Sequence, residues 1–223
     1  MLTGQDANFV AAMEDVLDVY VRPYNPHRPV ICLDEKPFML HDHYLEPLPM
    51  RPGSPAKLDY QYQRRGYCSI FSLIEPLTGQ QYVDIRKTRK AVDFAEVIAW
   101  LVDDLYPNAE RIVLVMDNLN THVPGSLYKR FPPAEAKRLL DRLEIHYTPK
   151  HGSWLNIAEI GIQLFSQDCL NRRIGSIEEV REELTAWCAE RNRLKKAIHW
   201  QFTTADARIK LRSLYPDITL VTD

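Results

Sequence analysis

The chain has 223 residues, enough for one sizeable domain, with a hydrophobic content of 45% and a charged content of 26% that are ordinary for a globular protein. No apolar run approaches the roughly 18 residues that span a bilayer, and the acidic N-terminus lacks the Lys or Arg of a signal peptide, so we expect a cytosolic protein. The net charge of −2 argues against a protein that binds DNA through an overall positive charge.

The first half of the chain predicts one helix and three strands. Apolar residues at spacings of three and four predict an amphipathic helix over 7–20. The apolar run 30–33 predicts a short buried strand with Asp34 at its end, and the prolines of 45–58 predict a loop. Residues 67–74 and 80–85 flank a tight loop and predict an antiparallel pair of strands.

The second half alternates helices and strands. Helices are predicted over 91–105, 132–143, 155–170 and 176–192, and strands over 112–116 and 145–147. Three strands followed by alternating helices and strands predict an α/β fold, with a mixed sheet and helices on both faces.

The charge is distributed unevenly. Residues 51–90 hold 8 basic and 3 acidic side chains, whereas residues 1–50 hold 3 and 8. The basic stretch ends in Arg86-Lys87-Thr88-Arg89-Lys90, which is either a phosphate-contacting surface or a solvated face. The four cysteines form no Cys-x-x-Cys pair, which favours free buried thiols over disulfides or zinc ligands.

Three carboxylates are the candidates for chemistry. Asp34 and Asp117 follow the two most apolar strands, and Glu159 lies near the start of a helix. Converging carboxylates form a hard oxygen-ligand site for Mg²⁺ or Mn²⁺, and two such ions suit phosphoryl transfer. Without metal they repel one another, so at least one pKa is expected to rise. The pattern alone leaves open that each Asp is a turn residue and Glu159 a helix-surface residue.

The sequence around these carboxylates resembles the three signatures of mariner-like DDE transposases. The segments are CLDE (32–35), MDNLNTH (116–122) and HGSWLNIAE (151–159), and the match extends to WQFTTADAR (200–208). It is most similar to the bacterial insertion-sequence branch, the six-thirty family. The three segments occur in the expected order, each on the expected type of element.

This resemblance implies a ribonuclease-H-like fold and cut-and-paste transposition. Asp34, Asp117 and Glu159 match the metal-binding triad, with two ions of Mg²⁺ or Mn²⁺ as cofactors. The implied partners are transposon ends and TA-containing target DNA, bound by a homodimer. The implied organisation is an N-terminal helix and linker over 1–29, a catalytic domain over 30–195 and a C-terminal extension over 196–223. Such a bacterial protein is cytoplasmic and associates with the nucleoid when acting.

The chain departs from the family pattern in two places. Between Asp117 and Glu159 lie 41 residues, more than the mid-thirties of mariner relatives, and the surplus fits the segment 128–143. About 29 residues precede the first strand, too few for the helix-turn-helix modules of relatives. We therefore expect a truncated copy or the second half of a split frame, with that module supplied by a separate chain.

Several neighbouring residues are secondary candidates. His122 is expected to orient the site or contact DNA, with a structural role on the turn as the alternative. Arg86, Lys87, Lys150 and Trp154 are candidate DNA contacts, Trp154 by stacking on a base. Glu35 is left out of the triad, because it points to the opposite face from Asp34 if the strand continues.

Three other residue patterns are interpreted as structural. Asn118 and Asn156 are interpreted as turn and helix-start residues, and His41-Asp42-His43 as a strand edge or loop without metal.

Two other functions compete with the transposase reading. One is a catalytically silent remnant that only binds DNA or a partner, and the other is a different ribonuclease-H-like nuclease, such as one acting on RNA–DNA hybrids. A nicking assay separates the first, and activity on hybrids without strand transfer identifies the second. An α/β enzyme unrelated to nucleic acids is disfavoured by the lack of a Gly-rich phosphate loop or nucleophile elbow.

Overall fold

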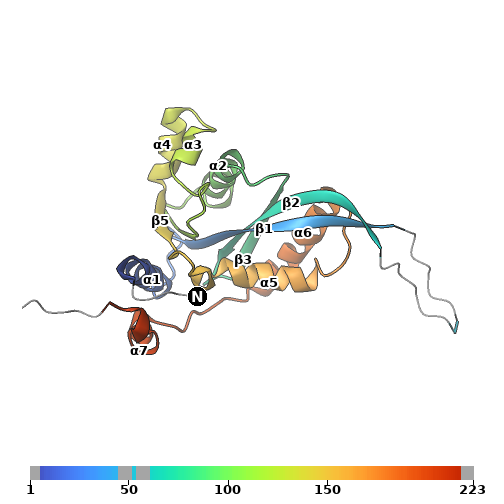
Figure 1. Cartoon of the computed structure of the whole chain (residues 1–223). Coiled ribbons are helices and arrows are strands. Elements are labelled where there is room, and N and C mark those ends of the chain that lie inside the picture. Colours follow the sequence, from blue (N-terminus) through green and yellow to red (C-terminus); the bar gives the residue numbers. More distant parts are fainter. Residues whose placement is uncertain (1–5, 45–51, 54–60, 217–223) are drawn as a thin grey trace, which may run out of the picture.

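The computed structural model of the chain describes residues 6–44, 52–53 and 61–216 (Figure 1). Its centre is one sheet of five strands in the order β3-β2-β1-β4-β5. The strands are β1 (Val30–His43), β2 (Tyr62–Glu75), β3 (Gln80–Arg86), β4 (Ile112–Met116) and β5 (Leu143–Tyr147). The pairs β1–β2 and β2–β3 are antiparallel, and β1–β4 and β4–β5 are parallel, so the sheet is mixed as predicted.

Helices cover both faces of this sheet, which also confirms the prediction. The α-helices are α1 (Ala7–Tyr20), α2 (Ala91–Trp100), α3 (Gly125–Tyr128), α4 (Pro133–Asp141), α5 (Ala158–Asp168), α6 (Ile177–Leu194) and α7 (Thr204–Lys210). A π-helical turn, Leu101–Leu105, extends α2, and 3₁₀ turns occupy Ser153–Leu155 and Arg212–Leu214. None of the described helices combines the length and apolar character that crossing a membrane requires.

The alternation of side chains along β1 sorts them between the two faces. Ile31 and Leu33 lie in a core with α2, α3 and α4. Cys32 points the other way, into a core formed with α1 and the segment before α5. Further along the same face, α5 and α6 pack over β1, β2 and β3. Consecutive β1 residues therefore serve opposite faces of the sheet, which decides the roles of Asp34 and Glu35.

The prediction that the first strand ends at Leu33 was wrong. β1 continues to His43, so Asp34 lies within the strand. Its pairing with β4 stops at Cys32, and beyond that residue β1 pairs only with β2. Pro37 lies in this edge portion, where a strand tolerates a residue without an N–H. The loop predicted over 45–58 falls outside the described residues except for the turn at 52–53.

The other predicted elements are present, most of them with shifted ends. The helix over 7–20 and the strand over 112–116 are confirmed at both boundaries. Leu143 begins β5 instead of ending a helix, and α5 begins at Ala158 after the 3₁₀ turn. Ser176 caps α6 by accepting a hydrogen bond from the Glu179 amide at 3.1 Å. The sequence reading missed α3 and α7.

The two ends of the described chain pack on each other. Glu14 of α1 forms an ion pair with Arg208 of α7 at 2.8 Å, and Thr204 donates a hydrogen bond to Asp18 at 2.7 Å. Ala207 is buried in the same core as α1 and β4. The N-terminal helix α1 and the C-terminal helix α7 thus pack in one shared hydrophobic core.

Candidate active site

Asp34 and Asp117 reach the same level of the sheet by different routes. The last parallel pair between β1 and β4 is Cys32 with Val115. Asp34 lies two residues beyond the first of these and Asp117 two residues beyond the second, directly after β4 ends. β4 ends at Met116, and the edge of β1 next to β4 is therefore unpaired beyond Cys32, where Asp34 lies. Both carboxylates therefore stand at the carboxyl end of the parallel strands, where α/β folds present functional groups.

Asn156 holds the start of α5, and with it Glu159, near this end of the parallel strands. The Asn156 side chain donates a hydrogen bond to the carbonyl of Leu33 at 2.8 Å and accepts one from the Ala158 amide at 3.1 Å. Asn156 thus tethers the start of α5 to the residue before Asp34. Tyr20 of α1 adds a second tether, because its hydroxyl donates to the carbonyl of Leu155 at 2.7 Å. The expected helix-start role of Asn156 is confirmed, and its link to β1 was not foreseen.

Asp34 and Glu159 line one open groove of about 670 Å³. The groove runs along α5, where Gln163 and Gln167 follow Glu159 at intervals of four residues, and Lys36 of β1 lines the opposite side. Asp117 is outside the groove lining, yet it is close enough for its charge to act on Asp34. The groove is lined mainly by polar side chains and has acidic groups at one end.

The pKa of Asp34 is raised to about 7. Burial is the largest cause, and the negative charges of Asp117, Glu35 and Glu159 push in the same direction. The expectation that one carboxylate titrates upward is confirmed in direction. Repulsion contributes less than loss of solvation, which the sequence did not reveal.

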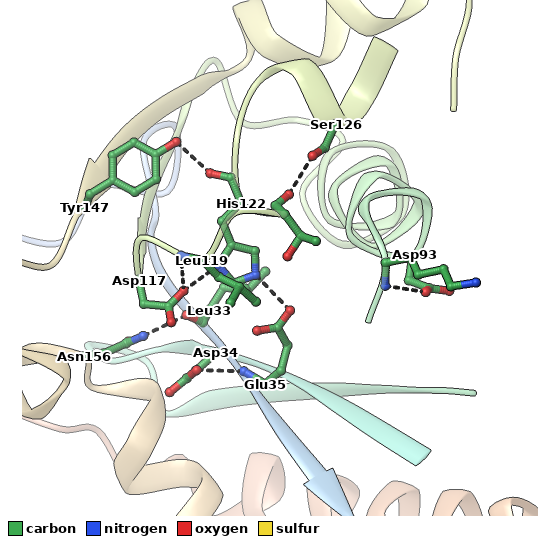
Figure 2. A network of polar contacts seen from close by, with 12 residues as sticks. Leu33, Asp34, Glu35, Asp93, Asp117, Leu119, His122, Ser126, Tyr147 and Asn156 are labelled. Atoms are coloured by element: carbon green, nitrogen blue, oxygen red, sulfur yellow. Dashed lines mark hydrogen bonds and ion pairs between the residues drawn. The ribbon is translucent and has the colours of Figure 1, made fainter. Parts of the chain in front are cut away.

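Asp117 is held by a hydrogen-bond network on the turn after β4 (Figure 2). One of its oxygens, Oδ1, contacts His122 Nδ1 at 2.6 Å and accepts the Leu119 amide at 3.1 Å. The other ring nitrogen of His122 contacts Glu35 at 2.8 Å. Burial alone lowers the pKa of His122, but the two carboxylates outweigh it and raise the pKa to about 9. Burial raises the pKa of Asp117, but His122 and Arg89 hold it below its usual value.

The candidate DNA contacts differ in how free they are. Arg86 forms ion pairs with Asp84 and Glu96, so its charge is already matched. Lys87, Arg89 and Lys150 are exposed, and Trp154 is 42% exposed with its ring edge against Phe202. Arg89, which the sequence placed only in a basic stretch, lies near enough to Asp117 to affect its pKa.

The remaining candidates play structural parts. In the His41-Asp42-His43 stretch of β1, Asp42 pairs with Arg65 at 3.0 Å, and His43 contacts Arg173 at 3.0 Å. The stretch is a strand edge, as interpreted. All four cysteines are free thiols, and three of them are buried.

Replacing Asp34 with Asn should change how the metal-free protein responds to pH. Because the pKa of Asp34 is about 7 in the fold and its ordinary value is 3.8, the unfolded chain loses this proton first as pH rises. The free energy of unfolding then falls between about pH 4 and 7, and the loss is complete above 7.

With EDTA present, Asp34→Asn should melt close to the parent near pH 4 and at least ~2–4 °C higher near pH 8, a shift that corresponds to about 1 kcal/mol. The exposed Asp104→Asn serves as control and should follow the parent at both pH values. A difference between parent and Asp34→Asn that is equal at both pH values contradicts the raised pKa.

Residues 29–181 match the family described as DDE superfamily endonuclease. Solved structures of similar fold include the Mos1 mariner paired end complex with Mn, at TM-score 0.55 and 18% identity, covering 82% of this chain and 54% of that one. The Mos1 strand transfer complex gives 0.57, 19%, 82% and 53%, and the Mos1 paired-end complex with left transposon end gives 0.59, 16%, 94% and 64%. The chain thus spans between half and two thirds of the length of these structures. No curated protein sequence matches it.

Proposed function

The chain belongs to the DDE superfamily of endonucleases, and from this premise we propose that it is the catalytic domain of a transposase that cleaves DNA and joins the cut end to a target. The observation that carries the proposal is the placement of Asp34 and Glu159 in one groove, with the charge of Asp117 beside them. Asp34 of β1 and Glu159 of α5 line this groove although they are far apart in sequence, and Asp117 on the turn after β4 is near enough for its charge to act on Asp34. The ribonuclease-H-like sheet supports the same reading.

These residues fit a divalent metal site. The donors are hard carboxylate oxygens, suited to Mg²⁺ or Mn²⁺. Asp117 Oδ2 has no hydrogen-bond partner among the described residues, and the pKa of Asp34 is raised mainly by burial, with smaller contributions from the neighbouring carboxylates. We propose that Asp34, Asp117 and Glu159 together hold two ions. When bound, such a pair polarises the scissile phosphate and stabilises the attacking and leaving oxygens.

Metal binding should stabilise the fold by an amount that rises with the logarithm of the metal concentration once that concentration exceeds the dissociation constant. Mg²⁺ or Mn²⁺ at ten times its dissociation constant is expected to raise the free energy of unfolding by about 1.4 kcal/mol. Glu159→Gln should gain much less, and without metal it should melt at the parent temperature or slightly above, because it removes one repelling charge.

The exposed Glu182→Gln on α6 keeps the triad intact and should gain as much as the parent. Equal stabilisation of parent and Glu159→Gln in thermal melts means that Glu159 is not a ligand.

DNA is proposed to lie across the groove and the exposed cations near it. Lys87 and Arg89 precede α2, Lys150 precedes the 3₁₀ turn, and Trp154 offers a ring face for a base. Arg86 is proposed to act mainly by holding this basic stretch through its own ion pairs.

Lys87→Ala and Arg89→Ala should each weaken duplex binding and each lower the slope of log K against log salt by about 1. Arg111→Ala removes an exposed charge at the opposite end of β4 from Asp117 and should leave the slope unchanged. Fluorescence anisotropy over a salt series measures all three slopes. Unchanged slopes for both Lys87→Ala and Arg89→Ala contradict this binding surface.

The finer assignments belong to the same proposal. We propose a member of the bacterial insertion-sequence branch, the six-thirty family, acting as a homodimer on transposon ends and on TA-containing target in the bacterial cytoplasm and nucleoid. The likeness to paired-end and strand transfer complexes supports this, and so do the three sequence signatures. Within the chain, residues 30–195 are proposed as the catalytic domain, with 1–29 and 196–223 as flanking segments.

A strand-cleavage assay tests the proposed function. Supercoiled plasmid, a duplex with a pre-cut 3′-hydroxyl end and an RNA–DNA hybrid are each incubated with the protein and Mn²⁺. Nicking of the plasmid together with joining of the pre-cut end to it supports a transposase domain. Cleavage confined to the hybrid, without joining, identifies a different nuclease, and no reaction with any substrate identifies a silent remnant.

A further inference from the structure

His122 is a buried ring clamped between two carboxylates from different parts of the chain. Its Nε2 lies 2.8 Å from Glu35 Oε1, and its Nδ1 lies 2.6 Å from Asp117 Oδ1 (Figure 2). The side chain of His122 is 0% exposed and that of Glu35 is 2% exposed. A carboxylate so far from water is costly unless it is hydrogen-bonded, and His122 is the side chain that bonds it.

Further contacts hold His122 in place. The His122 amide donates to the carbonyl of Leu119 at 2.8 Å, and the His122 carbonyl accepts the Tyr147 hydroxyl at 2.8 Å. The ring of Phe94 on α2 packs against the imidazole, with 4.8 Å between centroids. The imidazole therefore links the position of the Asp117 carboxylate to that of Glu35.

The consequence for Asp117 is a fixed rotation of its carboxylate. Oδ1 is held by both His122 Nδ1 and the Leu119 amide, which leaves Oδ2 as the oxygen available to a ligand. Glu35 supports this arrangement from the face of β1 opposite to Asp34, since neighbouring strand residues alternate. The dipeptide Asp34-Glu35 thus serves the site from both faces of the sheet.

A metal ion could instead be imagined among Glu35, Asp117 and His122, whose ligating atoms lie within 4.8 Å of one another. Both ring nitrogens, however, are directed at carboxylate oxygens at hydrogen-bond distance. A ring nitrogen that carries the proton donated to a carboxylate has no free lone pair for a metal. The cluster is therefore a hydrogen-bonded support and not a ligand set.

We propose that Glu35 is a positioning residue: through His122 it orients Asp117 so that Oδ2 faces the metal site. The proposal rests on the proposed function, because it assumes that Asp117 is a metal ligand. Supports of this kind, in which a carboxylate orients a histidine and through it the site, are generally worth about 10–100-fold in metal affinity.

The test measures Mn²⁺ affinity by electron paramagnetic resonance of the free ion, on protein shown to be folded. Glu35→Met keeps the volume without a hydrogen bond and should weaken Mn²⁺ binding about 10–100-fold. Glu35→Gln keeps an oxygen that accepts from His122 Nε2 and should stay within about threefold of the parent. The double variant Glu35→Met/His122→Ala should bind no more weakly than His122→Ala, because Glu35 acts only through the ring.

Glu75 supplies the matched control. It is a buried carboxylate on β2, 5% exposed, and it is hydrogen-bonded by Thr78 and Tyr106 on the same face of the sheet as Glu35. Glu75→Met should lower the melting temperature and leave Mn²⁺ affinity unchanged. Since that variant shares the burial of Glu35 but not its link to Asp117, it separates positioning from general loss of stability.

Four results overturn the proposal. Unchanged affinity in Glu35→Met shows that Glu35 positions nothing. A loss in Glu35→Gln as large as in Glu35→Met shows that charge and not the hydrogen bond matters. A directly coordinated nitrogen in the electron spin-echo spectrum of the parent with Mn²⁺ places the metal on His122. If the parent binds no Mn²⁺ at all, the proposed function fails together with this inference. The first two results, in contrast, overturn this inference and leave the proposed function intact.

Discussion

Glu159→Gln is expected to lower DNA strand cleavage by about 1,000-fold or more while the fold persists. The substitution keeps the shape of the side chain and removes one carboxylate from the groove shared with Asp34. A metal pair contributes several kcal/mol of transition-state stabilisation, and each 1.4 kcal/mol corresponds to a tenfold change in rate. Nicking of supercoiled plasmid in Mn²⁺, followed over time, measures the loss.

The matched control is Glu182→Gln, which removes an exposed carboxylate from α6 and should leave the cleavage rate within twofold of the parent. Circular dichroism and thermal melts establish that both variants are folded. Cleavage by Glu159→Gln within tenfold of the parent contradicts a ligand role for this residue and removes it from the triad.

Asn156→Ala is expected to be the most destabilising single change near the site. The side chain is 1% exposed and bonds both the Leu33 carbonyl and the Ala158 amide. Its removal leaves two buried backbone groups without partners, at about 1–3 kcal/mol for each, so a total loss of about 2–6 kcal/mol is expected. Because this tether places α5 beside β1, the affinity for Mn²⁺ should fall as well.

Urea denaturation measures that loss, with Asn8→Ala as the control. Asn8 is exposed on the first turn of α1, and its replacement should change the free energy of unfolding by less than about 0.5 kcal/mol. A loss below about 1 kcal/mol for Asn156→Ala contradicts the tethering role assigned to it.

Local sequence pattern was sufficient wherever one period dominated a segment. The apolar run before Asp117 has no competing interpretation, and β4 ends where the pattern ends. The run before Asp34 was misread because polar residues and Pro37 follow it, although the strand continues through them to His43. That continuation depends on pairing with β2 along an edge of the sheet, and a long-range pairing leaves no local signature.

The same limit applies to the site. The carboxylates could be selected from their positions after strands and from their surrounding motifs. The contact between Glu35 and His122 joins residues 87 positions apart, and the contact between Asn156 and Leu33 joins residues 123 apart. Only the direction of Glu35, opposite to Asp34, followed from strand alternation. What that side chain meets on the other face was set by the turn after β4 and by the packing of α2.

The most direct test of the central claim is a crystal structure of the protein with Mn²⁺, located by anomalous scattering. We expect metal peaks at the groove, contacted by oxygens of Asp34, Asp117 and Glu159, with His122 still hydrogen-bonded to Glu35 and Asp117. A metal bound instead by Glu35, His122 and Asp117, or a Glu159 carboxylate directed away from any peak, contradicts it.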